Sequence, residues 1–204
     1  MQAQVATNSR VTVLADVLQR AFRDDPVMRW ILPADIDYDR AALPLFSHIL
    51  SKTTDSQSCF TDSEERGVSL WESPGHRLSL PSQLNTFLKL AWLLKGNISR
   101  ASKIQAVMEN YKPRRPFWHL TYLATDPDFQ GQGIGRRLLS PITENLPASG
   151  VDKTPVYLEC SNKDSISFYL SQGFNLIEEV KIPDGPTIWP MSYSYRSQNN
   201  VLKQ

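Results

Sequence analysis

Apolar residues recur at intervals of three and four along the first part of the chain, and this spacing predicts an amphipathic helix. Ser9 is placed to cap that helix, and Pro26 ends it. A short turn is expected over residues 27–33. The next helical pattern spans roughly residues 38–53 and contains Pro44.

The middle of the chain changes from alternating to helical spacing. Short runs at 58–60 and 67–71 alternate around a polar turn and predict an antiparallel hairpin. Apolar residues then return to helical spacing over 84–92 and 99–111. We interpret this helical part, about residues 77–112, as an insertion in a larger fold.

The second half alternates between runs typical of strands and runs typical of helices. Strands are predicted over residues 117–125, 154–159, 174–182 and 188–195, and helices over residues 134–146 and 165–172. Pro141 lies inside the first of these helices, removes the hydrogen bond to the Arg137 carbonyl and should kink or shorten the helix. The order of elements predicts an α/β fold with a mixed sheet.

A glycine-rich stretch, Gln130-Gly131-Gln132-Gly133-Ile134-Gly135, lies between the best strand and the next helix. Glycines let successive backbone N–H groups converge on one anion, and a helix N-terminus directs its free N–H groups there. A Walker loop ends in Gly-Lys-Ser/Thr, whereas this loop ends in Gly-Arg-Arg, and the glycine spacing fails the dinucleotide pattern G-x-G-x-x-G. The remaining pattern is Q-x-x-G-x-G, and an ordinary tight turn is the alternative.

Two motifs in this order resemble the GNAT acetyltransferases. The first comprises residues 122–127 followed by 129–135, and the second comprises 159–162 followed by 167–169 and 172–174. The resemblance implies a GNAT-type α/β (α+β) fold, in which helices flank a mixed, mostly antiparallel central sheet. It also implies acetyl-CoA as cosubstrate, with no metal.

The resemblance assigns roles to residues of both motifs. Tyr169 is expected to be the acid that protonates the leaving thiolate. The residues expected to bind the cofactor lie at the strand end, in the loop and after the second motif's strand: Leu123, Ala124, Thr125, Gln130, Gly131, Gln132, Gly133, Ile134, Gly135, Arg136, Asn162 and Ser165.

Glu159 is predicted to be the base that takes the ammonium proton. It ends an apolar strand, where partial burial would raise its pKa toward neutrality. A surface carboxylate at a strand end is an equally good interpretation. His119 and Tyr122 are alternatives, and regular alternation along a strand would place them on opposite faces, so that only one faces the cleft.

The acceptor side carries no readable motif. An acidic loop with Trp30 and Tyr38 has the chemistry to hold a cationic, partly apolar amine, although a solvated loop is the simpler interpretation. Asp25, Trp30 and Trp189 are the predicted substrate-binding residues. The expected reaction is direct acetyl transfer to a small-molecule primary amine. A protein or peptide lysine acetyltransferase, an alcohol acceptor and a non-catalytic acyl-CoA-binding module remain alternatives.

Composition narrows the class of protein. The chain of 204 residues carries 22 Lys and Arg against 21 Asp and Glu, which argues against a nucleic-acid partner. Cys59 and Cys160 fit no metal or disulfide pattern and indicate reduced thiols. Residues 1–10 lack a signal-peptide core, and no apolar run approaches the ~20 residues that span a bilayer. We therefore expect a single cytoplasmic domain over residues 1–204, without a membrane partner.

Overall fold

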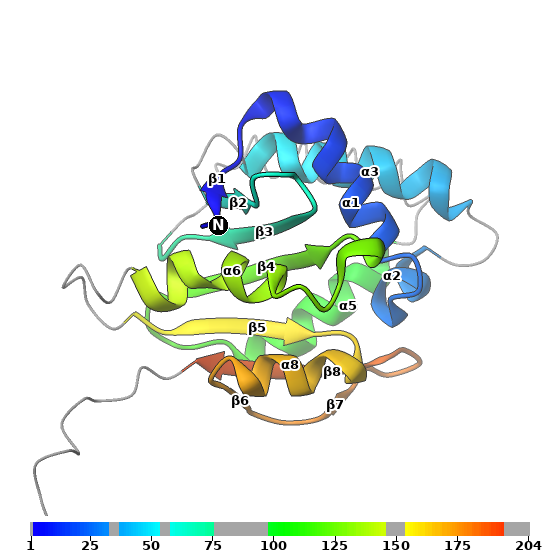
Figure 1. Ribbon diagram of the computed structural model, residues 1–204. Coiled ribbons are helices and arrows are strands. Elements are labelled where there is room, and N and C mark those ends of the chain that lie inside the picture. The colour runs from blue at the N-terminus through cyan, green and yellow to red at the C-terminus, as the bar shows by residue number, and fades with distance from the viewer. Residues whose placement is uncertain (1, 33–36, 54–57, 76–97, 146–153, 194–204) are drawn as a thin grey trace, which may run out of the picture.

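The computed structural model describes residues 2–32, 37–53, 58–75, 98–145 and 154–193 (Figure 1). The helix expected over 84–92 lies outside these residues, as does most of the expected insertion. Within the described residues, eight strands form one sheet in the order β1-β2-β3-β4-β5-β8-β6, with β7 paired to β8. The strands are β1 (Gln4–Val5), β2 (Cys59–Thr61), β3 (Gly67–Glu72), β4 (Trp118–Thr125), β5 (Val156–Cys160), β6 (Phe174–Leu176), β7 (Val180–Lys181) and β8 (Thr187–Tyr193).

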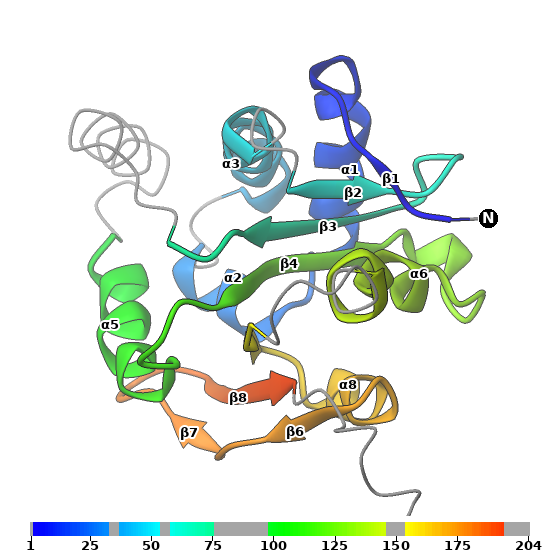
Figure 2. The same ribbon diagram turned by 90° about the vertical axis from the view of Figure 1, so that its left-hand side faces the viewer.

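Helices cover both faces of this sheet. Figure 2 shows α3 and α5 on one face and α6 and α8 on the other. The α-helices are α1 (Val11–Ala21), α2 (Pro26–Ile31), α3 (Tyr38–Thr53), α5 (Ile98–Met108), α6 (Ile134–Ser140) and α8 (Ile166–Ser171). Short 3-10 turns lie at Asn8–Arg10, Glu109–Tyr111, Pro127–Phe129 and Lys163–Ser165, and a π-turn lies at Pro141–Asn145.

The centre of the sheet holds its only parallel strand pair among the described residues. β4 and β5 are parallel, but only Trp118–Leu120 of β4 pair with Val156–Leu158 of β5. Beyond these three pairs the two strands diverge toward their carboxyl ends, as Figure 1 shows. The remaining strand pairs are antiparallel. The fold is therefore the mixed, mostly antiparallel sheet that the sequence predicts.

A bulge in β4 changes which side chains share a face. Tyr122 pairs with Leu70 and Leu120 pairs with Trp71, so Thr121 is an extra residue. Its hydroxyl donates to the Leu70 carbonyl at 3.0 Å. A bulge shifts the alternation of side chains by one position. The expectation that His119 and Tyr122 lie on opposite faces is therefore wrong.

Three hydrophobic clusters hold the helices against the sheet among the described residues. α1 and α3 pack on one face of β3 and β4 around Leu14, Leu18 and Phe46. On the other face α6 lies directly on β3, because a Cβ at Gly67 would be 2.7 Å from the Ile134 side chain. The position of α6 in turn fixes the loop before it.

Several predicted boundaries are confirmed and others are wrong. The helix predicted over residues 38–53 matches α3. Helix α6 ends at Ser140, directly before Pro141, as predicted. The Arg137 carbonyl, to which Pro141 cannot donate because it has no N–H, accepts from the Ser140 hydroxyl at 2.9 Å. Pro26 begins helix α2, where a turn was expected. The single strand expected over 174–182 is divided into β6 and β7. No described helix is long and apolar enough to cross a membrane.

Candidate functional site

A cleft of about 1310 Å³ lies where β4 and β5 diverge. Its walls come from both strands, from the loop between β4 and α6, and from α8. Helices α1, α2, α3 and α5 also contribute side chains. The cleft therefore lies between the two halves of the sheet, with the glycine-rich loop on its wall.

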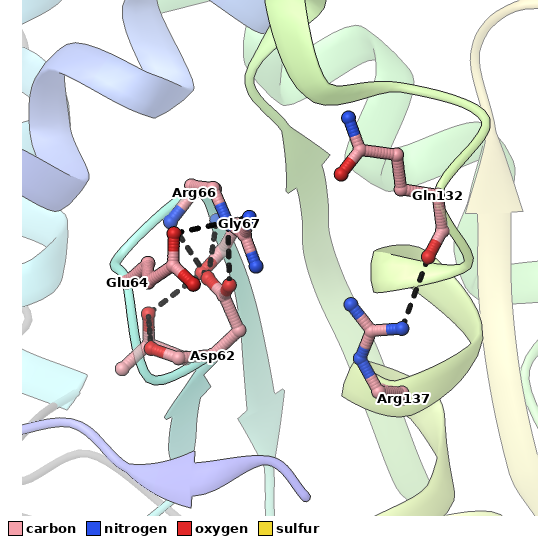
Figure 3. Close-up of polar contacts among 7 residues, drawn as sticks. Asp62, Glu64, Arg66, Gly67, Gln132 and Arg137 are labelled. Atoms are coloured by element: carbon pink, nitrogen blue, oxygen red, sulfur yellow. Dashed lines mark hydrogen bonds and ion pairs between the residues drawn. The ribbon is translucent and has the colours of Figure 1, made fainter. Parts of the chain in front are cut away.

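The loop has the conformation that only glycine adopts easily. Gly131 and Gly133 have φ angles of +77° and +72°, and Gly133 is the N-cap of α6. The Arg137 guanidinium donates to the Gln132 carbonyl at 3.0 Å and holds the loop against its own helix (Figure 3). Arg136, one residue earlier, lines the cleft.

The β2–β3 turn supports the strand next to this loop. Asp62 accepts hydrogen bonds from the Arg66 amide at 2.6 Å and the Gly67 amide at 3.2 Å (Figure 3). The Arg66 guanidinium also lies over the Phe129 ring, 5.4 Å from its centroid. The turn thus fixes the start of β3 beside the segment that leads into the loop.

Every residue expected to bind the cofactor lines the cleft except Gln132. The residues present fit an extended, phosphorylated ligand. On its β5 side, β4 has no strand partner beyond Leu120 among the described residues, so the backbone of Leu123 to Thr125 faces the cleft without a ladder there. An extended amide chain can pair with such an edge.

Glu159 belongs to a chain of three ionisable side chains. Its Oε2 lies 2.5 Å from His119 Nε2, and His119 Nδ1 lies 3.3 Å from Glu72 Oε2. Burial lowers the pKa of His119, but the hydrogen bonds to both carboxylates outweigh burial and raise it to about 9. At neutral pH Glu159 therefore has an imidazolium as its direct partner. Glu72, at the end of β3, was not among the predicted site residues.

Tyr169 lies in the cleft on α8. Its ring makes edge contacts with Phe168 and Phe174, with centroids 5.2 and 5.7 Å away. Burial raises the pKa of the Tyr169 phenol above its ordinary value, and the nearby Cys160 and Asp25 act in the same direction. The hydroxyl therefore stays protonated and can donate. Burial also raises the pKa of Cys160, to about 11, so this thiol is a poor nucleophile.

Asp25 is the buried carboxylate on the acceptor side of the cleft. One oxygen caps α2 by accepting from the Val27 and Met28 amides at 3.0 and 2.9 Å, and the other accepts from the Ser161 hydroxyl. The residue is only 7% exposed. Burial raises the pKa of Asp25, although its hydrogen bonds oppose this effect. Ser161, which follows the Cys160 of the second motif, was not predicted.

The two tryptophans expected to bind substrate do not line the cleft. The Trp30 indole donates to the Asp184 carbonyl at 2.9 Å, and the Trp189 indole donates to Glu179 at 3.1 Å. Other side chains form the acceptor wall, and most of them are apolar: Phe22, Val27, Ile31, Ile104 and Met108. Within the described ranges, no group of three or more His, Cys, Asp and Glu is placed to hold a metal ion.

Comparison with known sequences finds matches to part of this chain. Residues 83–174 match the model of the acetyltransferase (GNAT) family. Mycothiol acetyltransferase of Propionibacterium freudenreichii is 33% identical over 63 residues, and the ribosomal protein bS18-alanine N-acetyltransferase of Escherichia coli K12 is 42% identical over 53 residues. These stretches cover 31% and 26% of this chain, but only 20% and 36% of the two relatives.

Solved structures resemble almost the whole chain. A histone acetyltransferase HPA2 and related acetyltransferase from Corynebacterium glutamicum has a TM-score of 0.61 at 21% identity, over 97% of this chain and 98% of its own. The Drosophila melanogaster polyamine N-acetyltransferase, described as forming N-acetylagmatine, has a TM-score of 0.63 at 15% identity, over 95% of this chain and 99% of its own. At these identities the comparison establishes the fold.

Proposed function

We propose that this chain, which has the GNAT fold and matches the GNAT family model over residues 83–174, is an acetyl-CoA-dependent N-acetyltransferase. The acceptor that we propose is a small-molecule primary amine, attacked directly without an acyl-enzyme. The observation that carries the proposal is the divergence of β4 from β5 beside the glycine-rich loop, with Tyr169 and two carboxylates in the same cleft.

Different residues of the cleft would bind different parts of acetyl-CoA. When bound, this cosubstrate supplies the acetyl thioester. Backbone N–H groups of residues 130–135, the N-terminus of α6 and the Arg136 guanidinium suit a pyrophosphate. The free edge of Leu123 to Thr125 suits the amides of a pantetheine arm, and one of its N–H groups can polarise a carbonyl. Asn162 and Ser165 lie on the opposite side of the cleft.

The reaction requires an acid that protonates the leaving thiolate and a base that takes the ammonium proton. Tyr169 provides the acid, because its phenol is protonated and lies in the cleft. Glu159 and Asp25 are the carboxylates of the cleft that can take a proton, apart from the more exposed Glu72 and Asp164. Cys160 takes no covalent part, because its thiol is protonated and no His-Cys pair is present among the described residues.

The walls of the cleft favour an amine with an apolar body. Apolar side chains of α1, α2 and α5 line the acceptor side around the buried Asp25. The polyamine acetyltransferase among the similar structures agrees with a small cationic acceptor. Further stretches resemble puromycin N-acetyltransferase, and we propose a relative of that enzyme acting on a drug-, toxin- or metabolite-like amine. These stretches are Ala21-Phe22-x-x-x-Pro26, Pro113-x-x-Pro116-x-Trp118, Leu158-Glu159 and the segment 180–191.

A protein or peptide acceptor is the second candidate. The relative named for alanine of ribosomal protein bS18 supports it. A polypeptide requires a groove open at both ends, whereas α5 places Ile104, Gln105 and Met108 on the cleft wall. This wall favours the small amine. A non-catalytic acyl-CoA-binding module needs neither Tyr169 nor a carboxylate in the cleft.

The test is thiol release from acetyl-CoA across a panel of acceptors. The panel holds puromycin, arylalkylamines, polyamines, amino acids, a lysine peptide, an alanine-terminated peptide and simple alcohols. We expect turnover with one class of small amine. Turnover with a peptide alone would contradict the small-molecule acceptor, and binding of acetyl-CoA without turnover on any acceptor would contradict the enzymatic function.

A further inference from the structure

We propose that the Ser161–Asp25 pair accepts the proton of the acceptor's ammonium group, in place of the Glu159 that the sequence predicts. The inference rests on the proposed function and assigns its base. Ser161 would contact the amine, and Asp25 would act through the Ser161 hydroxyl.

The geometry joins the two residues at the divergence of the strands. Ser161 directly follows β5, and its hydroxyl donates to Oδ2 of Asp25, the N-cap residue of α2. Both residues line the cleft, together with Tyr169 and Cys160. The Ser161 oxygen keeps lone pairs that can accept from an incoming ammonium group. The acid and the proton acceptor therefore lie in the same part of the cleft.

Charge distinguishes Asp25 from Glu159. The Glu159 carboxylate already pairs with the His119 imidazolium. In the described part of the chain no Lys, Arg or His pairs with Asp25, and Arg23 pairs with Asp39 instead. Burial without a cation raises the pKa of Asp25 and makes it a stronger base than an exposed aspartate. A bound ammonium group would supply the missing positive charge.

Arg23 and Arg29 act on Tyr38 and stay charged, and His48 of α3 lines the same cleft. Four other titratable groups near Asp25 stay neutral over the working pH range: Cys160 of β5, Tyr169 of α8, Tyr122 of β4 and Tyr38 of α3. Burial raises the pKa of Cys160 to about 11 and that of Tyr122 to about 12, and it raises the pKa of both other phenols. Unlike these four groups, Asp25 can change its charge, and with it the activity, between acidic and neutral pH.

The proton step balances without another reactant. One N–H bond of the ammonium group breaks as the Ser161 oxygen takes that proton. At the same time the O–H bond of Ser161 breaks and its proton passes to Asp25 Oδ2. The products are a neutral amine with a free lone pair, an unchanged serine and a neutral carboxylic acid, which later returns its proton to water.

The experiment compares Asp25→Asn, Ser161→Ala, Ser161→Thr and Glu159→Gln, with Asp24→Asn as the matched control on an exposed neighbour. Asparagine caps helices as well as aspartate does, so Asp25→Asn keeps the α2 cap and removes only the proton acceptor. The readouts are the pH profile of kcat with the best amine of the panel, the acetyl-CoA Kd from calorimetry and the melting temperature.

We expect Asp25→Asn to lower kcat by about 10²–10⁴-fold and to abolish the acid limb of the kcat profile, with the acetyl-CoA Kd within about twofold of the wild type. Ser161→Ala should follow it, and Ser161→Thr should restore most of the activity. Glu159→Gln should keep the acid limb. An acid limb retained in Asp25→Asn, or lost in Glu159→Gln, overturns the inference. A wild type inactive with every acceptor overturns the proposed function and the inference together.

Discussion

The Tyr169 phenol is held by two aromatic rings and stays protonated because it is buried. It touches the reacting atoms in the proposed reaction, while the rings position it. Tyr169→Phe keeps both aromatic contacts and removes only the hydroxyl. We expect kcat to fall about 10²–10³-fold with the acetyl-CoA Kd unchanged, as the loss of a general acid predicts. Steady-state kinetics and calorimetry measure both. An equal loss of kcat and of acetyl-CoA affinity would show that Tyr169 binds the cosubstrate and does not act as the acid.

The buried charge of Asp25 should cost stability in the unliganded protein. Its folded-state pKa is raised, so the folded protein favours the protonated form. The protonated Asp25 carboxyl therefore contributes its full stability to the folded protein below the unfolded-state pKa. This contribution is lost as pH rises through the folded-state pKa and the carboxyl becomes charged.

Asp25→Asn should therefore melt higher than the wild type at pH 8, by about 2–4 °C, which corresponds to about 1 kcal/mol for a chain of this size. The advantage should shrink toward pH 4, about the pKa of an unfolded aspartate, because the wild-type carboxyl takes up its proton as the pH falls. Thermal melts at both pH values test this, with Asp24→Asn as the control. A lower melting temperature at pH 8 would mean that the charge itself stabilises the cap.

At the scale of elements, two glycines of the loop have different reasons to be glycine. Gly133 has a φ of +72°, whereas Gly135 has no positive φ but lies where a Cβ would be 3.1 Å from the Phe168 ring. Gly133→Ala should strain the loop by about 1 kcal/mol and raise the KM for acetyl-CoA. Gly135→Ala should displace α8 with Tyr169 and lower kcat more than it raises KM.

Steady-state kinetics of the two alanine variants separates these effects, and Gly75→Ala is a matched control. Gly75 also has a positive φ, +76°, but apart from its chain neighbours no atom of the described residues lies within 4 Å of its Cβ position, and it is not among the residues that line the cleft. It should strain its own turn without changing either kinetic constant. An identical change of KM in the Gly133 and Gly135 variants would contradict the assignment.

Local patterns predicted the elements better than the contacts between them. Helix α3 and the end of α6 at Pro141 follow from spacing and from the missing proline N–H. The break between β6 and β7 lies opposite Pro190 of β8. The Pro190 carbonyl accepts from the Ile177 amide at 2.9 Å, but Pro190 has no N–H with which to donate a ladder hydrogen bond to this strand. That signal was present in the sequence, but only the pairing register shows which strand faces Pro190.

The candidate site was predictable where it lies on one continuous segment. The loop residues, Tyr169 and Glu159 each belong to a motif readable along the chain. The partners of Glu159 and Asp25 come from other strands and helices, and the bulge at Thr121 sets the β3–β4 register that places Glu72 opposite His119. A bulge leaves no reliable trace in a single sequence, so Glu72 could not be found from the pattern alone. Ser161 could not be found either, because its contact with Asp25 joins residues 136 positions apart.

At the scale of the whole molecule, the two halves of the sheet meet along only three residue pairs of β4 and β5. The chain Glu72–His119–Glu159 crosses this junction and links β3, β4 and β5. The pKa of His119 is about 9 in the folded protein against about 6.5 when unfolded, so its contribution is fully present below pH 6.5 and is lost as pH rises through 9.

His119→Gln should therefore lose up to about 3 kcal/mol of unfolding free energy at pH 6, and less where solvent screens the exposed Glu72. The difference from the wild type should shrink by pH 10. Denaturant unfolding at both pH values measures it, and Glu72→Gln should show a smaller loss with the same sign. A difference that is independent of pH would mean that the ring contributes only packing.

A ligand that spans this junction should stabilise the molecule as one unit. The proposed acetyl-CoA site uses the edge of β4 in one half and Asn162 and Ser165 in the other. At about 100 times its Kd, acetyl-CoA should add about 2.7 kcal/mol and raise the melting temperature by about 5–10 °C. At the same free concentration, ADP, which can occupy only the loop, should bind more weakly and give a smaller shift. Calorimetric melts at equal free ligand concentration compare the two. Equal shifts would show that the loop alone accounts for binding, and that the free edge of β4 has no part in it.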